Sequence, residues 1–186
     1  MKKIFTKIFK DKELPFIELR YSNSNTHYKK HFHTTFSLGV NVQGESLYSN
    51  SEKEYTLRKN GLSIINPNAV HSCNSSNDVL NEYYMMYLDT YWCMNIQKLI
   101  NDKITSFVNI PKHILEDEYF YKEYILLCNY MFEEYSSIDK EDMLITFFMK
   151  FFALFLEESN EKIIDDKFEK MVSHLHEHYK ENITLD

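Results

Sequence analysis

Three histidines in the first half of the chain have the spacing expected of a metal site or a polar ligand site. His31 and His33 flank Phe32, and residues two apart point to the same side of a strand, so both imidazoles can face one cavity. His71 follows about forty residues later, after a turn that contains Pro67. Imidazole suits Zn, Cu, Fe and Ni, and it also forms hydrogen bonds to ligands or within a structural core. All three roles are open at this point.

The strand that follows His33 is marked by strict alternation of apolar and polar residues. Over residues 36–43 the apolar side chains are Phe36, Leu38, Val40 and Val42, and between them lie Ser37, Gly39, Asn41 and Gln43. This alternation predicts a β-strand with one buried apolar face. The polar face is shared with His33, so its side chains either line a ligand pocket or lie in solvent.

A second two-faced strand is predicted over residues 79–88. Its two faces carry Tyr83, Met85 and Tyr87 on one side and Tyr84, Met86 and Leu88 on the other. Further short runs at 46–49, 54–58 and 62–65 are separated by turn residues. Short strands at turn spacings of about 8–12 residues predict an antiparallel sandwich or barrel.

Helical periodicity replaces the strand pattern after Asp89, over residues 91–101, 116–135, 139–159 and 165–181. Strands followed by helices predict an α+β fold with segregated parts. The run 143–156 is apolar around almost its whole circumference, which predicts burial on several sides. It is shorter than the about 20 residues that span a bilayer. Its burial is either within one chain or partly against a second subunit.

Composition excludes several classes of function. The 186 residues carry 28 acidic and 21 basic side chains, a net charge of −7, so the chain as a whole does not attract nucleic acid. Cys73, Cys93 and Cys128 are widely spaced, which fits buried thiols in the cytosol. Nucleophile-elbow, P-loop and dinucleotide-binding motifs are absent. The N-terminus has no signal-peptide pattern. We therefore expect a cytoplasmic protein that is not an enzyme.

The last twenty residues predict the beginning of a second structural unit. Apolar side chains form one stripe along a helix, at Phe168, Met171, Val172, Leu175 and Tyr179. Asn182 interrupts this helix, and Thr184 has the character of the N-cap of another. Two helices joined by a short turn begin a helix-turn-helix; the alternative is an ordinary terminal helix.

Taken together, these motifs resemble the cupin-type effector domain of AraC-family transcriptional regulators. The resemblance is carried by His31-Phe32-His33 with Phe36, by Gly44 after the next strand, and by the block from Gly61 through Pro67 to His71. The ending Tyr179-x-x-Asn182-Ile183-Thr184-Leu185 resembles the entry to the first helix-turn-helix of that family. The order of barrel, helices and helix-turn-helix onset is also the family's order.

The resemblance implies a cupin-like antiparallel β-barrel, or double-stranded β-helix, over residues 1–110 and a helical dimerisation segment over 111–164. Residues 165–186 would be the onset of a DNA-binding domain that is truncated at Asp186. The implied function is sensory: a small polar molecule in the barrel controls DNA binding by the missing domain. The implied partners are that effector and a second copy, through helices 116–159, with no membrane. The expected ligand-binding residues are His31, His33, Asn41, Gln43, His71 and Tyr83, with no catalytic residue, metal or cofactor.

The competing hypothesis is a metal-dependent cupin enzyme that uses His31, His33 and His71. Metal-dependent cupins place a Glu shortly after the His-x-His pair, whereas residues 36–38 here are Phe, Ser and Leu. Their second motif reads Pro-x-Gly-x-x-His, and residues 67–71 lack the Gly and are one residue shorter. A site with two histidines and one carboxylate therefore cannot be assembled from these motifs, although a three-histidine site remains chemically possible.

Overall fold

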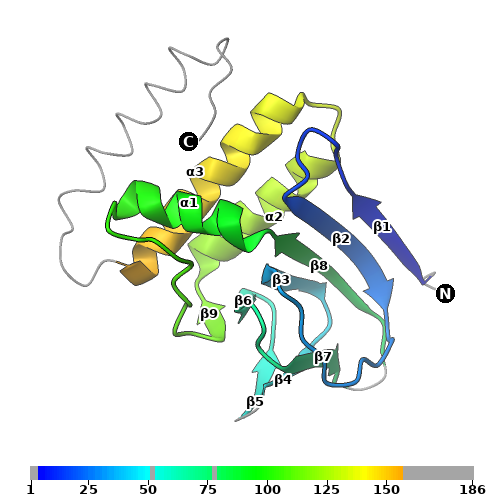
Figure 1. Cartoon of the computed structure of the whole chain (residues 1–186). Coiled ribbons are helices and arrows are strands. Elements are labelled where there is room, and N and C mark those ends of the chain that lie inside the picture. Colours follow the sequence, from blue (N-terminus) through cyan, green and yellow to red (C-terminus); the bar gives the residue numbers. More distant parts are fainter. Residues whose placement is uncertain (1–3, 51–52, 77–78, 157–186) are drawn as a thin grey trace.

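The computed structural model of the chain describes residues 4–50, 53–76 and 79–156. Within these ranges the chain forms nine strands, in two antiparallel sheets, and three helices (Figure 1). The predicted α+β order, strands first and helices after, is confirmed apart from one short strand, Ile114–Glu116, that follows the first helix. The helix and helix-turn-helix onset predicted over 165–186 lie outside the described residues.

The larger sheet has six strands in the order β1-β2-β8-β3-β6-β9. Their bounds are Phe5–Phe9 (β1), Ile17–Ser24 (β2), Asn81–Leu88 (β8), Phe36–Gln43 (β3), Gly61–Ile65 (β6) and Ile114–Glu116 (β9). The two strands with the clearest alternation, β3 and β8, are direct neighbours at its centre. β9 lies in the segment that was predicted to be helical. It is only three residues long, which is too short for an alternating pattern to be recognised in the sequence. It forms by pairing with β6.

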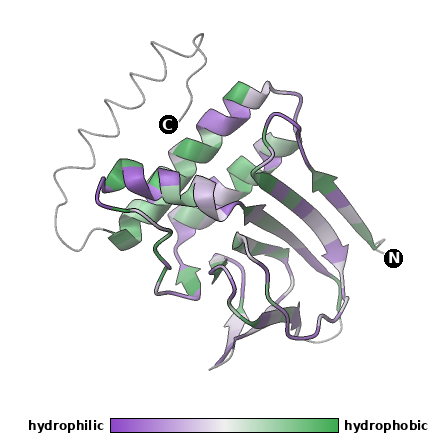
Figure 2. Ribbon diagram, in the orientation of Figure 1, coloured by the Kyte–Doolittle hydropathy of each residue, from purple (hydrophilic) through white to green (hydrophobic). Residues whose placement is uncertain are grey.

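The smaller sheet consists of β5 (Glu54–Leu57), β4 (Ser46–Asn50) and β7 (His71–Ser75), in that order. Because β3 pairs with β8 and β4 pairs with β7, the chain rolls up on itself and places the small sheet opposite the large one. Figure 2 shows that the last turns of α3 (Ser137–Leu156) are green, and the cluster of buried hydrophobic residues joins β3 and β8 to the helices. The hydrophobic core therefore lies on the helix side of the large sheet.

Three helices cover the outer face of the large sheet: α1 (Thr90–Ile100), α2 (Glu118–Phe132) and α3 (Ser137–Leu156) (Figure 1). Asp89 caps α1 by accepting hydrogen bonds from the backbone amides of Tyr91 and Trp92, and Asp117 caps α2 in the same way. α3 is buried along most of its length, as its all-round apolar character predicted. No helix in the described ranges has the length and hydropathy needed to cross a membrane.

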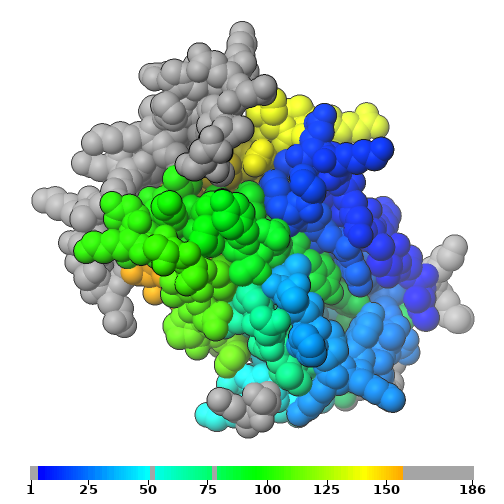
Figure 3. All heavy atoms as spheres, in the orientation of Figure 1, coloured from blue at the N-terminus to red at the C-terminus, as the bar shows by residue number. Residues whose placement is uncertain are grey.

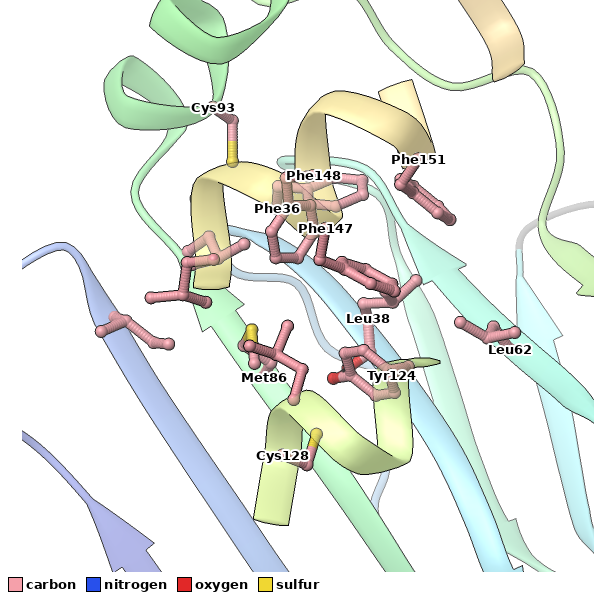
Figure 4. Packing of buried hydrophobic residues seen from close by; sticks show 14 of the residues in the cluster. Phe36, Leu38, Leu62, Met86, Cys93, Tyr124, Cys128, Phe147, Phe148 and Phe151 are labelled. Atoms are coloured by element: carbon pink, nitrogen blue, oxygen red, sulfur yellow. Dashed lines mark hydrogen bonds between the residues drawn. The ribbon is translucent and has the colours of Figure 1, made fainter. Parts of the chain in front are cut away.

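Figure 4 shows how the apolar residues of β3 and β8 meet the helices. Phe36, Leu38 and Met86 are fully buried against Phe147, Phe148 and Phe151 of α3. The rings of α3 and β3 pack mostly at tilted or edge-on angles, which aromatic pairs prefer.

α2 is tied to the large sheet by hydrogen bonds as well as by packing. The hydroxyl groups of Tyr121 and Tyr124 donate to the backbone carbonyls of Asn41 and Leu38, at 3.0 and 2.5 Å. One helix thus holds two points along β3.

Candidate functional site

A cavity of about 170 Å³ lies between the two sheets, on the side of the large sheet that faces away from the helices. Its wall includes Arg20, Ser22, Gly39, Asn41, Ser63, Tyr83, Met85 and Tyr87 from the large sheet, His71 and Cys73 from the small sheet, and Tyr28 and His31 from the segment after β2. Drug-sized ligands occupy pockets of about 300–1,000 Å³. The cavity is therefore suited to a smaller molecule.

The cavity runs from an exposed mouth to a buried end. At the mouth, Tyr28 is 45% exposed and the side chain of Arg20 is 44% exposed. The buried part of the wall, here called the deep end, contains Asn41, Ser63 and His71, which are at most 3% exposed. In the space-filling view the light-blue segment after β2 covers the lower right of the molecule (Figure 3). This segment brings Tyr28 to the mouth.

Gly39 keeps the floor of the cavity open. A Cβ atom at this position would lie 2.6 Å from Cε of Met85 and 2.8 Å from Oγ of Ser63. Met85 is paired with Gly39 across β3 and β8. Any larger residue at position 39 must push the Met85 side chain out of its place, so the absence of a side chain here is part of the shape of the site.

The three predicted histidines meet in space. His31 and His71 form a backbone bridge in which each amide donates to the carbonyl of the other at 2.9 Å. The His71 ring centroid lies 4.5 Å from that of His31 and 4.8 Å from that of His33. His31 and His71 line the cavity. His33 is not among the lining residues, and its ring packs edge-on against Tyr87.

Backbone carbonyl groups fix the tautomer of His31 and His71. Nδ1 lies 2.8 Å from the Lys29 carbonyl in His31 and 2.9 Å from the Ala69 carbonyl in His71. A carbonyl oxygen only accepts, so in these two rings Nδ1 carries the hydrogen and Nε2 is an acceptor whenever the ring is neutral. In His33, Nδ1 lies 3.1 Å from the Thr35 carbonyl and 3.0 Å from the Thr35 hydroxyl, which can donate or accept.

Burial keeps the inner rings neutral. Burial lowers the pKa of His71 to about 4. The hydrogen bond to the Ala69 carbonyl raises this pKa, and the neighbouring His33 and His31 lower it further, but burial has the largest effect. Burial lowers the pKa of His33 in the same direction. The deep end of the cavity therefore presents a neutral imidazole with an acceptor nitrogen.

The histidine cluster does not fit a metal site. Among the described residues, no group of three or more His, Cys, Asp or Glu side chains is arranged to hold a metal ion. The cavity wall supplies no carboxylate that could complete a set with the imidazoles. The cluster is therefore a hydrogen-bonding group, and no metal-dependent step is assigned to it.

Two other predicted ligand residues line the cavity and one does not. Asn41 and Tyr83 are both in the wall. The Asn41 amide is held by donating to the Leu57 carbonyl at 3.0 Å and by accepting from the Ser46 hydroxyl at 3.1 Å. A register shift between Asn41 and Gln43 breaks the alternation, and Gln43 is exposed and outside the wall. The predicted ligand contacts of His33 and Gln43 therefore have no support in the geometry.

Arg20 is the most important residue that sequence analysis missed. It lies in β2, its guanidinium group is 5.0 Å from the centroid of the Tyr87 ring, and its Nε donates to Glu18. The signal was present, because Arg20 and Ser22 alternate with apolar Leu19 and Tyr21. Only the pairing of β2 with β8 shows that the polar side of this strand faces a cavity.

The remaining groups of the wall are neutral or hydrogen-bonding groups. Burial raises the pKa of the Cys73 thiol to about 11, so the nucleophilic thiolate is suppressed at neutral pH. Burial also raises the pKa of Tyr83 and Tyr87, so both phenols remain hydrogen-bond donors. The wall offers hydroxyl groups, amides, one neutral imidazole at depth and one guanidinium group at the mouth.

Two antiparallel sheets that roll around a polar cavity, with helices packed on the outer face, define a cupin-like domain. The sequence model of the AraC-like ligand-binding domain matches residues 15–140. The chain belongs to this family.

Among solved structures, the chain is similar to an RmlC-like cupin family protein with a double-stranded β-helix fold from Methanocaldococcus jannaschii, with 10% identity and a TM-score of 0.41 over 48% of this chain and 83% of that one. It is also similar to a cupin superfamily protein from Desulfitobacterium hafniense, with 8% identity and a TM-score of 0.41 over 47% of this chain and 78% of the other. No curated protein matches the sequence.

Proposed function

We propose that this chain is the sensory part of an AraC-family transcriptional regulator. In this proposal a small polar molecule enters the cavity between the sheets and controls DNA binding by a C-terminal domain. The chain would act as a cytoplasmic ligand-binding protein and not as an enzyme. Control requires that the ligand bind one arrangement of the regulator more tightly than another.

One observation carries the proposal: a cavity lined mostly by polar residue types lies within the segment that matches a ligand-binding family. Buried polar groups are costly unless they are paired, and a cavity with such a wall is the default location for a ligand. The suppressed Cys73 thiol and the lack of a metal cluster among the described residues favour binding over catalysis.

A route from the cavity to the helices supports a sensory role. Gly39 and Asn41 of β3 line the cavity, and the carbonyls of Leu38 and Asn41 accept hydrogen bonds from Tyr124 and Tyr121 of α2. A ligand that presses on this strand would therefore act on α2 through hydrogen bonds at the same residue, Asn41, or one residue away, at Leu38.

The first test is a thermal-shift screen of polar metabolites with the full chain and three variants. Gly39→Ala, and more strongly Gly39→Val, should narrow the cavity through Met85 and Ser63. Gln43→Val changes an exposed position of the same strand and is the matched control. A true effector raises the Tm of the wild type and of Gln43→Val, and has a smaller effect on Gly39→Ala. Equal shifts in all proteins would place binding elsewhere.

The regulatory half of the proposal has its own test. The parent protein with its DNA-binding domain should change its affinity for operator DNA when the effector from the screen is added. A compound that binds the cavity tightly and leaves operator affinity unchanged would contradict a sensory role.

We also propose that α2 and α3 mediate homodimerisation. Tyr119 and Leu126 of α2 are 51% and 59% exposed, beside a shallow groove that also includes Met143 of α3. Exposed apolar side chains gathered on one face mark interaction surfaces. Leu126→Glu should give a monomer in sedimentation-velocity analysis, whereas Val108→Glu, at an exposed position in another segment, should not.

A further inference from the structure

The charge of the cavity wall points to the charge of the ligand. The chain carries more acidic than basic side chains, yet the lining residues include no Asp or Glu. Their one permanent charge is the guanidinium group of Arg20. A cationic ligand would find no counter-ion in this wall, whereas an anionic one would find it at the mouth.

The surroundings of Arg20 leave positive charge available there. Glu18 is the carboxylate beside it, and the same carboxylate also pairs with Lys10 at 2.7 Å. Two cations thus share one anion. No other carboxylate of the described residues forms an ion pair with Arg20. Glu18 binds at Nε, and a guanidinium group has terminal N–H donors beyond Nε that match a carboxylate.

The phenol groups near Arg20 are suited to the same anion. Tyr28, Tyr83 and Tyr87 line the same cavity, and the guanidinium group is held over the Tyr87 ring at 5.0 Å. A phenol hydroxyl group can donate a hydrogen bond to a carboxylate. Stacking on an aromatic ring also holds the planar guanidinium group in place.

The deep end of the cavity, in contrast, favours a hydroxyl group and disfavours an anion. His71 is 3% exposed and its Nδ1 is committed to the Ala69 carbonyl at 2.9 Å, so Nε2 is an acceptor. An anion beside this lone pair would be repelled, whereas a hydroxyl group can donate to it. Ser63 lies in the same wall, with a hydroxyl that donates to the Gly39 carbonyl at 3.3 Å and that retains lone pairs to accept.

We propose that the ligand is a small hydroxylated carboxylic acid, oriented with its carboxylate at Arg20 and its hydroxyl groups toward His71 and Ser63. This inference rests on the proposed ligand-binding function and adds the charge and the direction of the bound molecule. A volume of about 170 Å³ limits the acid to a short chain or a single ring. A neutral sugar would satisfy the deep end and leave the mouth unused.

The test compares matched probes with the same carbon skeleton. Glycerate, threonate and gluconate are titrated into the full chain by calorimetry, each beside its uncharged amide and its alcohol. The acid of at least one set should bind at least about tenfold more tightly than its amide, because a hydrogen-bonded charge contributes more than a neutral group. Its affinity should fall as salt concentration rises.

Two arginine variants provide the control. Arg20→Gln should reduce the affinity for the acid by about 10- to 100-fold and remove its advantage over the amide. Arg58 is also ion-paired through Nε, to Glu45 at 3.1 Å, and lies outside the cavity wall. Arg58→Gln should leave all affinities unchanged. His71→Gln should weaken the binding of the acid, the amide and the alcohol alike.

The possible results separate this inference from the function on which it rests. If alcohols or amides bind as tightly as the acids, and Arg20→Gln does not change this, the anionic ligand class is wrong while ligand binding stands. If aminosugars such as glucosamine bind best, the assigned charge is wrong in sign. If no probe of any charge binds, both the ligand class and the effector-binding function are contradicted.

Discussion

The two faces of the central strand β3 are equally hidden from solvent as far as Asn41, but they differ in what covers them. Phe36, Leu38 and Met86 face the helices and are 0% exposed, packed against aromatic rings. Ser37 and Ser63 face the other way and are also 0% exposed. There the wall is polar and encloses a cavity. Burial alone thus does not distinguish a core from a binding site; the difference lies in side-chain polarity and in unfilled volume.

The residues of the two faces also differ in how much they contribute to the stability of the fold. The helix-facing residues gain free energy by excluding water from apolar surface. The polar cavity-facing residues stabilise the fold mainly through hydrogen bonds to neighbouring side chains and backbone groups, which contribute about 1 kcal/mol each. Substitutions on the two faces should therefore have different consequences, although they alternate along the same strands.

The largest difference is expected between neighbouring residues of β3. Phe36→Ala removes a ring that packs on Phe107, Phe148, Phe151 and Phe152, and it should lower the free energy of unfolding by about 3–5 kcal/mol. Ser37→Ala, on the opposite face, should change it by less than about 1 kcal/mol. Urea denaturation of both variants measures the contrast. Similar losses in the two variants would show that the faces are energetically alike.

A pH dependence should arise from the cavity face. The unfolded chain protonates His71 near its ordinary pKa of 6.5, whereas the folded chain does so only near pH 4. Between these values the unfolded state binds more protons, so stability should fall as the pH is lowered from about 6.5 to about 4. The loss from this one group is at most on the order of 3 kcal/mol.

The variant His71→Gln identifies the source of that slope. Denaturation midpoints measured across this pH range should depend much less on pH in His71→Gln than in the wild type. A helix-face variant such as Leu38→Val should keep the slope of the wild type. Identical slopes in wild type and His71→Gln would mean that His71 titrates normally in the folded protein.

Within the cavity face, Asn41 should matter for stability. Its amide donates to the Leu57 carbonyl and accepts from Ser46, and these bonds connect the large sheet to β4 and β5. Asn41→Ala leaves both partners without this amide and should cost about 2 kcal/mol of unfolding free energy. Chemical denaturation tests this directly, and an unchanged midpoint would mean that water replaces the amide.

The smallest effect is expected at Gln43, two residues further along the same strand. Gln43→Ala should change the free energy of unfolding by no more than about 0.5 kcal/mol and should not change ligand affinity. Sequence alternation predicts the opposite, a loss of affinity. Titration of this variant with the effector therefore decides between the alternation and the register shift that the structure contains.

The alternation of β3 and β8 was enough to predict the two faces of the large sheet, because a period of two is imposed by the strand itself. The resemblance to cupins made a cluster of His31, His33 and His71 possible, and the structure brings their rings together. The strand faces depend on local sequence, whereas this cluster depends on the backbone bridge between His31 and His71.

Features that depend on pairing partners were not predictable. Gln43 leaves the cavity face because the pairing of β3 with β8 shifts after Asn41, and a shift of this kind has no signal within one strand. Arg20 becomes a wall residue only because β2 pairs with a strand about sixty residues later. The cation of the site was thus visible in the sequence, but its position was not.

The pairing of β8 with both β2 and β3 has a consequence for how the chain folds. β8 lies between β2 and β3, so the central part of the large sheet cannot form until residues 81–88 have left the ribosome. The hydrogen bond from Tyr124 to the Leu38 carbonyl joins residues that are 86 positions apart. Contacts this distant along the chain slow folding. During synthesis β2 and β3 would expose unpaired edges, which are prone to aggregation. The cavity should therefore be one of the last parts to form, and nascent chains would depend on chaperones until β8 is inserted.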